Sequence, residues 1–175
     1  MTSPDASPGN LEIERRFLVR PADGPPAESG VRITQGYLAT SDRVSVRVRI
    51  GQDQDFGLLT IKSRHSGATR YEYEYPIPLA DGQDFLYTFC DRVIEKVRCP
   101  IVFGTNTWVV DRFLGSNTGL CIAECEMTSA DLELAIPLWC GLEITDDDRF
   151  RNDHLASLPI SSWSTEERAN FKEIG

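Results

Sequence analysis

The chain has 175 residues, of which 41% are hydrophobic and 26% charged, a balance typical of a globular domain with an apolar core. Its 27 acidic and 18 basic residues give a formal net charge of -9, which disfavours broad binding to nucleic acid or to anionic membranes. Any anion that this protein binds must therefore meet a local cluster of cations.

The first ten residues are polar and lack the basic start and apolar stretch of a signal peptide. No stretch approaches the roughly 20 apolar residues of a membrane span. We expect residues 1–10 to be a disordered tail and residues 11–175 to form a single domain in the cytoplasm. Five cysteines without a CxxC pair, and only two histidines, give little support for a zinc site, so reduced thiols are expected.

Nine segments alternate apolar and polar residues in the manner of β-strands, and Gly, Asp, Asn and Ser turns separate them. The predicted strands are Leu11–Val19, Val31–Ala39, Val44–Ile50, Gly57–Ser63, Thr69–Ile77, Ile94–Cys99, Thr107–Phe113, Leu120–Met127 and Gly141–Thr145. The fold class is therefore mainly β (α+β).

Helical patterns interrupt the strands and follow them. The predicted helices are Asp81–Val93, a short one after Ser129, a turn or two within Asp147–Leu158, and a C-terminal helix after Ser164. In the first helix Phe85, Phe89 and Val93 share one face, and in the last Glu167 completes a capping box with Ser164. We expect these helices to cover sheet surface.

One face of the predicted strands carries charged residues almost exclusively, since residues two apart on a strand point the same way. Its bases are Arg16, Arg47, Arg49, Lys62, Arg70, Lys96 and Arg98, and its acids are Glu12, Glu14, Glu72, Glu74, Asp111, Glu124 and Glu126. For any one strand, the simplest interpretation is an antiparallel sheet with a wet face. Repetition over seven strands instead favours a closed eight-stranded antiparallel β-barrel with a charged interior. The outer face of its strands is mostly apolar, and helices are expected to flank it.

The pairing of charges indicates what such an interior binds. Glu-x-Glu occurs three times, at Glu12/Glu14, Glu72/Glu74 and Glu124/Glu126, and carboxylate oxygens are ligands that Mg²⁺ and Mn²⁺ prefer. Arginine and lysine side chains suit phosphate oxygens. The lining therefore predicts a site for a phosphate chain chelated to a divalent cation.

The order of motifs resembles that of the CYTH superfamily, the triphosphate tunnel metalloenzymes, from about residue 11 to residue 158. The motifs are LEIERRFLV, QGYL, SVRVRI, LTIKS, RYEYEYPI, EKVR, VDRF, AECEM and ITDDDRFRN. The pattern is most similar to short bacterial inorganic tripolyphosphatases. The resemblance implies a tunnel that binds the triphosphate part of a substrate and requires a divalent metal, Mg²⁺ or Mn²⁺.

The resemblance also implies roles for the matching residues. The implied metal ligands are Glu12, Glu14, Glu124 and Glu126, and the implied triphosphate-binding residues are Arg47, Arg49, Lys62, Arg70, Lys96 and Arg98. The remaining candidate catalytic residues are Arg16, Tyr37, Glu72, Glu74 and Asp111. Tyr37 matches a tyrosine near one tunnel mouth, while Arg16 replaces the motif lysine. Because arginine stays protonated, Arg16 is not expected to be a general base.

The leading hypothesis is metal-dependent hydrolysis of inorganic tripolyphosphate to pyrophosphate and phosphate, because the short domain leaves little sequence for an organic-group pocket. Alternatives are a class IV-type adenylate cyclase and a thiamine or nucleoside triphosphatase. Arg16 in place of lysine also keeps open a non-enzymatic triphosphate or polyphosphate binding module. The expected partner is a small-molecule triphosphate, with no nucleic acid or membrane, and the protein is expected to be a monomer or homodimer.

The segment after residue 144 leaves two further questions. Its aspartates, Asp146 to Asp148, fit a helix N-terminus better than a metal cluster. Arg149 and Arg151 fit phosphate contacts and solvated helix charges equally well. Tryptophans 108, 139 and 163 are interpreted as core packing, and histidines 65 and 154 as surface residues.

Overall fold

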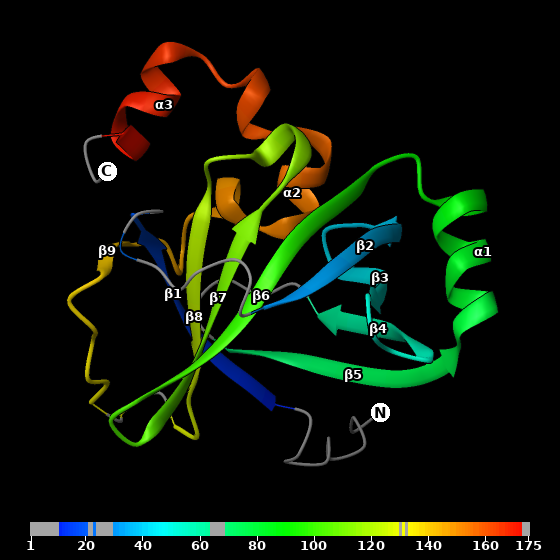
Figure 1. Ribbon diagram of the computed structural model, residues 1–175, viewed down its shortest axis with the longest axis horizontal. Coiled ribbons are helices and arrows are strands. Elements are labelled where there is room, and N and C mark those ends of the chain that lie inside the picture. Colours follow the sequence, from blue (N-terminus) through cyan, green and yellow to red (C-terminus); the bar gives the residue numbers. More distant parts are fainter. Residues whose placement is uncertain are drawn as a thin grey trace, which may run out of the picture.

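The computed structural model describes residues 11–20, 23, 30–63, 69–129, 131 and 133–172 (Figure 1). The expected tail, residues 1–10, and His65 lie outside these ranges. The strands are β1 (Leu11–Val19), β2 (Val31–Thr40), β3 (Val44–Gly51), β4 (Phe56–Ser63), β5 (Thr69–Pro78), β6 (Val93–Phe103), β7 (Asn106–Phe113), β8 (Cys121–Glu126) and β9 (Cys140–Glu143). The helices are α1 (Leu79–Phe89), α2 (Asn152–Ser157) and α3 (Thr165–Lys172), with short 3₁₀ turns η3 (Gly115–Asn117), η4 (Asp148–Phe150) and η5 (Ile160–Ser162).

Strands β1 to β8 close into an antiparallel barrel, as the alternating charged pattern predicted. The neighbours run in the order β5-β4-β3-β2-β6-β7-β8-β1, with β9 added at the outer edge of β1. Strand β1 closes the ring because its first residues, Leu11 to Ile13, pair with Thr69–Tyr71 of β5, while Glu14 to Leu18 pair with β8. All nine predicted strands are present, with ends that differ by a few residues.

The inward face of the barrel changes from charged to apolar along the strands. Leu18 follows Arg16 on the same face of β1, and Ile94 precedes Lys96 on the same face of β6. These residues belong to a buried cluster that we call the end plug: Leu18, Ile94, Phe113, Leu120, Ile122, Ile144, Phe150, Leu155, Ile160 and Trp163. Helix α2 contacts β2 and β6 and lies at this end of the strands (Figure 1). The C-terminal segment thus fills one end of the barrel with hydrophobic side chains.

Helix α1 differs from its prediction at both ends and in its packing. It begins at Leu79 and ends at Phe89, because the chain is already extended at residue 90 and Val93 opens β6. The predicted apolar face is wrong, since Phe89 and Val93 are exposed. Instead Gly82 is buried against Ile50 and Gly57, where the missing side chains allow the helix to approach the sheet closely.

The outward face of the barrel is covered over only part of its area. Around β1, β7 and β8, a second cluster contains Phe17, Trp108 and Ala123. On β4 and β5, Ile61 and Tyr75 are exposed, so the helices leave this part of the sheet surface uncovered. The cause is the placement of the covering elements: α1 lies alongside β2, β3 and β4, and the segment before β9 lies over the other side.

The prediction of a short helix after Ser129 is wrong for the residues described there. Residues 131 and 133–139 form turns and irregular chain. Leu134 packs into the Trp108 cluster, and Trp139 meets Trp108 edge to face with ring centroids 5.7 Å apart. Extended chain can place both side chains on β7 and β8, whereas one short helix would turn one of them away. The core-packing interpretation of the tryptophans is confirmed, since Trp163 is also buried.

The C-terminal segment follows its predicted capping signals. Ser164 and Glu167 form the expected capping box, with the Glu167 amide donating to Ser164 Oγ at 3.2 Å and the Ser164 amide donating to Glu167 Oε2 at 2.7 Å. The Asp147 carboxylate accepts from the Arg149 amide at 3.1 Å and starts η4, which confirms the helix-terminus interpretation of the aspartates. No helix in the described ranges is long and apolar enough to cross a membrane.

Leu155→Ala should lower the free energy of unfolding by about 2–5 kcal/mol, because Leu155 is fully buried in the end plug and its truncation leaves a cavity. Leu158→Ala is the matched control, because Leu158 is 53% exposed three residues later; it should cost less than about 1 kcal/mol. Urea denaturation followed by circular dichroism measures both. Equal losses would mean that α2 does not pack into the barrel end.

Candidate active site

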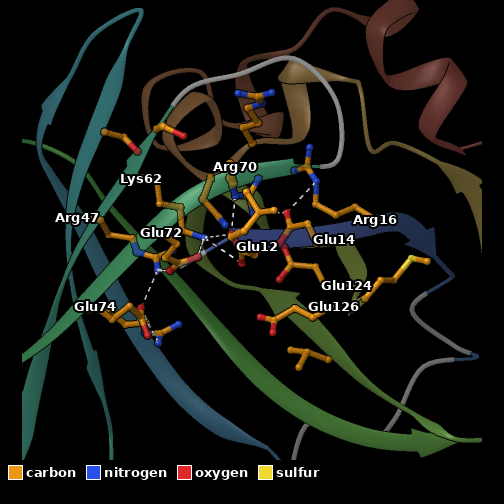
Figure 2. A pocket seen from close by; sticks show the side chains of 18 of the residues that line it. Glu12, Glu14, Arg16, Arg47, Lys62, Arg70, Glu72, Glu74, Glu124 and Glu126 are labelled. Carbon is orange, nitrogen blue, oxygen red and sulfur yellow. Dashed lines mark hydrogen bonds and ion pairs between the residues drawn. The ribbon is translucent and has the colours of Figure 1, made fainter. Parts of the chain in front are cut away.

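The charged part of the barrel interior encloses a cavity of about 770 Å³ (Figure 2). Its charged lining comes from β1, β3, β4, β5, β6, β8 and the segment that begins α2. The predicted site residues that line it are Glu12, Glu14, Arg16, Tyr37, Arg47, Arg49, Lys62, Arg70, Glu72, Glu74, Arg98, Glu124 and Glu126. Lys96 and Asp111 are absent from this lining.

The first group of charges surrounds Glu12 at the join between β1 and β5. Arg70 Nε donates to Glu12 Oε2 at 2.6 Å, and Lys62 Nζ lies 3.1 Å from the same oxygen. Arg70 also forms an ion pair with Glu14. Two carboxylates thus hold two of the predicted phosphate-binding cations in place.

Glu12 and Glu72 form a coupled carboxyl pair within this group. Burial and the hydrogen bond to Glu12 raise the pKa of Glu72 to about 7. Burial opposes ionisation of Glu12 too, but the hydrogen bond to Glu72 and the charges of Lys62 and Arg70 hold its pKa far below the usual range. The pair therefore holds a proton below about pH 7, and Glu72 is the carboxyl that is more readily protonated.

The second group of charges lies on β3, β4 and β5. Glu74 accepts from Thr60 Oγ1 at 2.9 Å and pairs with the Nη2 atoms of Arg47 at 3.4 Å and Arg49 at 3.3 Å. Arg47 Nε is buried and has no hydrogen-bond partner among the described residues. An unpaired donor of this kind, in a cavity wall, fits an anionic ligand that accepts from it.

The third group is a wall of carboxylates on β1 and β8. Glu14 lies directly opposite Glu126 in the antiparallel register, and Glu124 is the next inward residue of β8. Figure 2 shows the three carboxylates gathered on this wall. Burial and the nearby Glu124 charge raise the pKa of Glu14, even though Arg70 pairs with Glu14 and Arg98 pairs with Glu124 at 3.1 Å. Within the described ranges, no three His, Cys, Asp or Glu side chains form a complete metal site.

Lys96 and Asp111 lie behind the cavity wall. Both are fully buried, and Lys96 Nζ lies 2.6 Å from Asp111 Oδ2. Asp111 also accepts from Arg98 Nε at 2.8 Å and from Arg98 Nη2 at 2.7 Å. Burial lowers the pKa of Lys96 to about 8, whereas for Asp111 the Lys96 and Arg98 charges overcome burial and hold the pKa well below its usual range. This buried triad orients Arg98, which itself lines the cavity.

Two other predicted residues occupy distinct places. Burial raises the pKa of Tyr37 to about 12, so its hydroxyl is neutral and accepts from Gln35 Nε2 at 3.3 Å. The guanidinium of Arg16 is turned toward backbone carbonyls of the C-terminal segment, and its Nε lies 3.6 Å from Glu14 Oε1. Neither group is placed to act as a general base.

The C-terminal segment also contributes to the lining. Arg151, Asn152 and Asp153 line the cavity, whereas Arg149 pairs with Asp147 at 2.6 Å and does not line it. The sequence pattern left Arg149 and Arg151 equivalent, because neither lies on a strand with a defined inward face. Neutral lining residues were also missed: Ser45, Ser63, Thr105, Asn106, Thr107 and Thr128. Their strand parity, or their place in a hairpin, is the only sequence signal that would have suggested them.

The fold and this interior define a class of protein: a closed antiparallel barrel that holds cations and carboxylates around one polar cavity. Residues 10–129 match the CYTH domain model. The chain is 39% identical to an inorganic triphosphatase of Acetivibrio thermocellus, over 93% of this chain and 98% of that protein. It is 35% identical to an inorganic triphosphatase of Nitrosomonas europaea, over 85% of this chain and 99% of that one.

A crystal structure of an inorganic triphosphatase superposes with a TM-score of 0.59 at 32% identity, covering 83% of this chain and 93% of that chain. A structure of a Pyrococcus furiosus protein, at 16% identity and a TM-score of 0.53, shares the fold. This chain belongs to the CYTH domain family.

Asp111→Asn should lower the free energy of unfolding by about 3–5 kcal/mol, because it leaves Lys96 buried without its counter-charge. The matched control is Glu95→Gln, which breaks the exposed pair between Arg32 and Glu95 on the neighbouring position of β6. This control should cost at most about 1 kcal/mol. Chemical denaturation measures both values, and comparable losses would contradict the buried triad.

Glu72→Gln should flatten the dependence of thermal stability on pH. The native pKa of Glu72, about 7, exceeds its ordinary value of 4.5, so the folded protein holds a proton that the unfolded chain releases. Stability from this group is therefore complete below about pH 4.5 and is lost as pH rises through about 7. Glu12 shifts in the opposite direction and titrates below this window. Melting curves from pH 5 to pH 8, recorded with chelator, should show a smaller fall for the variant; parallel falls would exclude the shared proton.

Proposed function

We propose that this protein is a divalent-metal-dependent triphosphatase that hydrolyses inorganic tripolyphosphate to pyrophosphate and phosphate. The observation that carries the proposal is one cavity whose wall combines bases suited to phosphate with the carboxylates Glu14, Glu124 and Glu126, where burial and the Glu124 charge raise the pKa of Glu14. The similarity to two inorganic triphosphatases over nearly their whole length supports the same reaction class.

The bases are arranged to hold a phosphate chain. Arg47 and Arg49 on β3, Arg70 on β5 and Arg98 on β6 face the same cavity, and each is oriented by a carboxylate. A triphosphate carries several negative charges, and guanidinium groups bind its oxygens through two parallel hydrogen bonds. Because the cations are already fixed, they can stabilise charge on the phosphoryl oxygens without reorganising.

The carboxylates of β1 and β8 are suited to hold the metal. Glu14, Glu124 and Glu126 present oxygen ligands on one wall; burial and the Glu124 charge raise the pKa of Glu14, and a cation there would offset the repulsion between the two carboxylates. Protein ligands need not complete the site, because Mg²⁺ usually keeps several waters and binds substrate phosphates. When bound, such an ion neutralises phosphoryl oxygens and lowers the pKa of a coordinated water. Carboxylate oxygens and water suit both Mg²⁺ and Mn²⁺, so both ions belong in the assay.

The substrate proposed is an inorganic chain because the lining offers little for an organic group. Tyr37 is the one aromatic side chain among the described lining residues, and it is only partly exposed, with its hydroxyl bonded to Gln35 Nε2. The remaining neutral lining residues are serines and threonines, Asn106 and Asn152, and three dispersed apolar side chains, Leu11, Val109 and Met127. The five cysteines, all within the described residues, form no disulfide, which agrees with a cytoplasmic location.

Phosphate release from tripolyphosphate should be rapid with Mg²⁺ or Mn²⁺ and absent with chelator, while ATP and pyrophosphate should be poor substrates. Two variants separate the roles of the lining. Glu126→Gln should raise the metal concentration for half-maximal activity about tenfold, because a carboxylate ligand is lost. Arg49→Ala should instead raise KM for tripolyphosphate about tenfold, because a charged phosphate contact is lost.

Wild-type activity in both variants would contradict the assignment of this cavity. Release of cyclic AMP and pyrophosphate from ATP would replace the hydrolase by a cyclase. Tight metal-dependent binding of tripolyphosphate without phosphate release would make the protein a binding module.

A further inference from the structure

The Arg16 side chain is bound by the protein itself. Its Nη2 donates to the carbonyl oxygens of Thr145 at 3.1 Å and Ile144 at 3.4 Å, and its Nη1 donates to that of Phe150 at 3.3 Å. Its Nε lies 3.6 Å from Glu14 Oε1, and the side chain is only 5% exposed. All three guanidinium nitrogens therefore have partners within the chain, and their charge is directed at carbonyl oxygens.

Through these contacts the Arg16 side chain links the two ends of the segment 144–150: the carbonyls of Ile144 and Thr145 at its start and that of Phe150 at its end. Ile144 and Thr145 are also held to β1 by other bonds, since the Ile144 amide donates to the Arg16 carbonyl at 2.8 Å and the Arg16 amide donates to Thr145 Oγ1 at 3.1 Å. What the Arg16 side chain adds is the contact with the carbonyl of Phe150. A planar guanidinium can bridge carbonyls on two sides of a turn, which an ammonium on a flexible stem does less well.

The residue after this anchored carbonyl is Arg151, which lines the cavity. Its Nε lies 2.7 Å from Asp148 Oδ1, and the Asp148 side chain is 76% exposed. The Arg151 side chain is 20% exposed, whereas Asp148 lies mostly in water, so solvent weakens the pair from the carboxylate side and a phosphate group in the cavity can compete for the guanidinium. Arg149 is placed oppositely, over the Phe150 ring at 5.6 Å and against Asp147.

We infer that Arg16 is a positioning residue that fixes the carbonyl of Phe150, and that the segment so fixed delivers Arg151 as a substrate-binding cation. Arg16 then serves the triphosphate through Arg151 instead of contacting it. This inference rests on the proposed function, because it assigns Arg151 to the phosphate chain in the same cavity.

The first part of the test is a set of variants at Arg151 and Arg149, assayed for kcat and KM on tripolyphosphate with Mg²⁺. Arg151→Gln should raise KM about tenfold and change kcat less than about threefold, as expected when binding common to ground and transition states is lost. Arg151→Lys should restore KM to within about threefold of wild type. Arg149→Gln removes the same charge two residues earlier and should leave KM within about twofold.

The second part is a double-mutant cycle with Arg16→Gln. If Arg16 acts through Arg151, the double variant should raise KM no more than about threefold beyond Arg151→Gln alone. Independent contacts that each raised KM about tenfold when removed would instead multiply to about a hundredfold. Hydrogen exchange without substrate gives a second readout: Arg16→Gln should speed exchange of the Phe150 and Arg151 amides, and Arg151→Gln should not.

An unchanged KM in Arg151→Gln, multiplicative effects in the cycle, or unaltered exchange in Arg16→Gln would each overturn the inference. If Arg16→Gln does not fold, the comparison of Arg151→Gln with Arg149→Gln still decides whether Arg151 binds substrate. If wild-type protein releases no phosphate, the proposed function fails, and the same variants are compared by calorimetric titration with tripolyphosphate and Mg²⁺. If only the Arg151 and Arg16 variants weaken tripolyphosphate binding, the inference about Arg151 holds even though the protein is not a hydrolase.

Discussion

The structure depends on the mutual neutralisation of charges that a closed barrel keeps away from bulk water. A cation or carboxylate in such a place is costly unless a counter-charge lies beside it. Antiparallel pairing supplies the partners: Arg98 on β6 lies opposite Asp111 on β7, and Lys62 on β4 lies opposite Glu72 on β5. The same register that closes the barrel therefore also makes its charged interior tolerable.

Charges are not neutralised to the same extent everywhere around the cavity, and two regions of its wall differ in this respect. Lys96, Arg98 and Asp111 satisfy one another behind the lining, so they give rigidity and orient one cation. On the wall of Glu14, Glu124 and Glu126, Arg70 pairs with Glu14 and Arg98 with Glu124, yet burial and the Glu124 charge still raise the pKa of Glu14. A bound phosphate chain with its metal ion would supply the opposite charges where each is missing. The ligand thus completes the electrostatics of the fold.

Much of this arrangement follows from strand parity in the sequence. Period-two alternation sorted residues such as Glu12, Arg47 and Glu124 onto one face, and charged side chains repeated over seven strands predicted the closed barrel. Parity gives the face of a residue but not its depth. Lys96 has the same parity as Arg98 yet lies behind the wall, because Asp111 draws it away from the cavity.

The parts that sequence could not provide are those set by long-range contacts outside the strands. The position of Arg151 depends on how the segment after β9 crosses the barrel end, and no local periodicity encodes that path. The same holds for Phe89, whose helical spacing predicted burial although Gly82 makes the close contact. Arg16 was predicted to line the site, and its engagement with the carbonyl of Phe150 required the folded C-terminal segment.

The end plug makes the two ends of the barrel different, because hydrophobic side chains fill one of them. With one end of the barrel filled by side chains such as Leu18, Ile122 and Trp163, a linear polymer cannot be threaded through the molecule. A phosphate chain would have to enter terminus first, and only as many units as the charged depth accepts would be inside. The leaving fragments would depart by the route of entry, so the occupied barrel would exclude a second substrate until it emptied. A packed hydrophobic cluster, remote from any reacting atom, would in this way determine that the enzyme trims ends and does not cut chains in the middle.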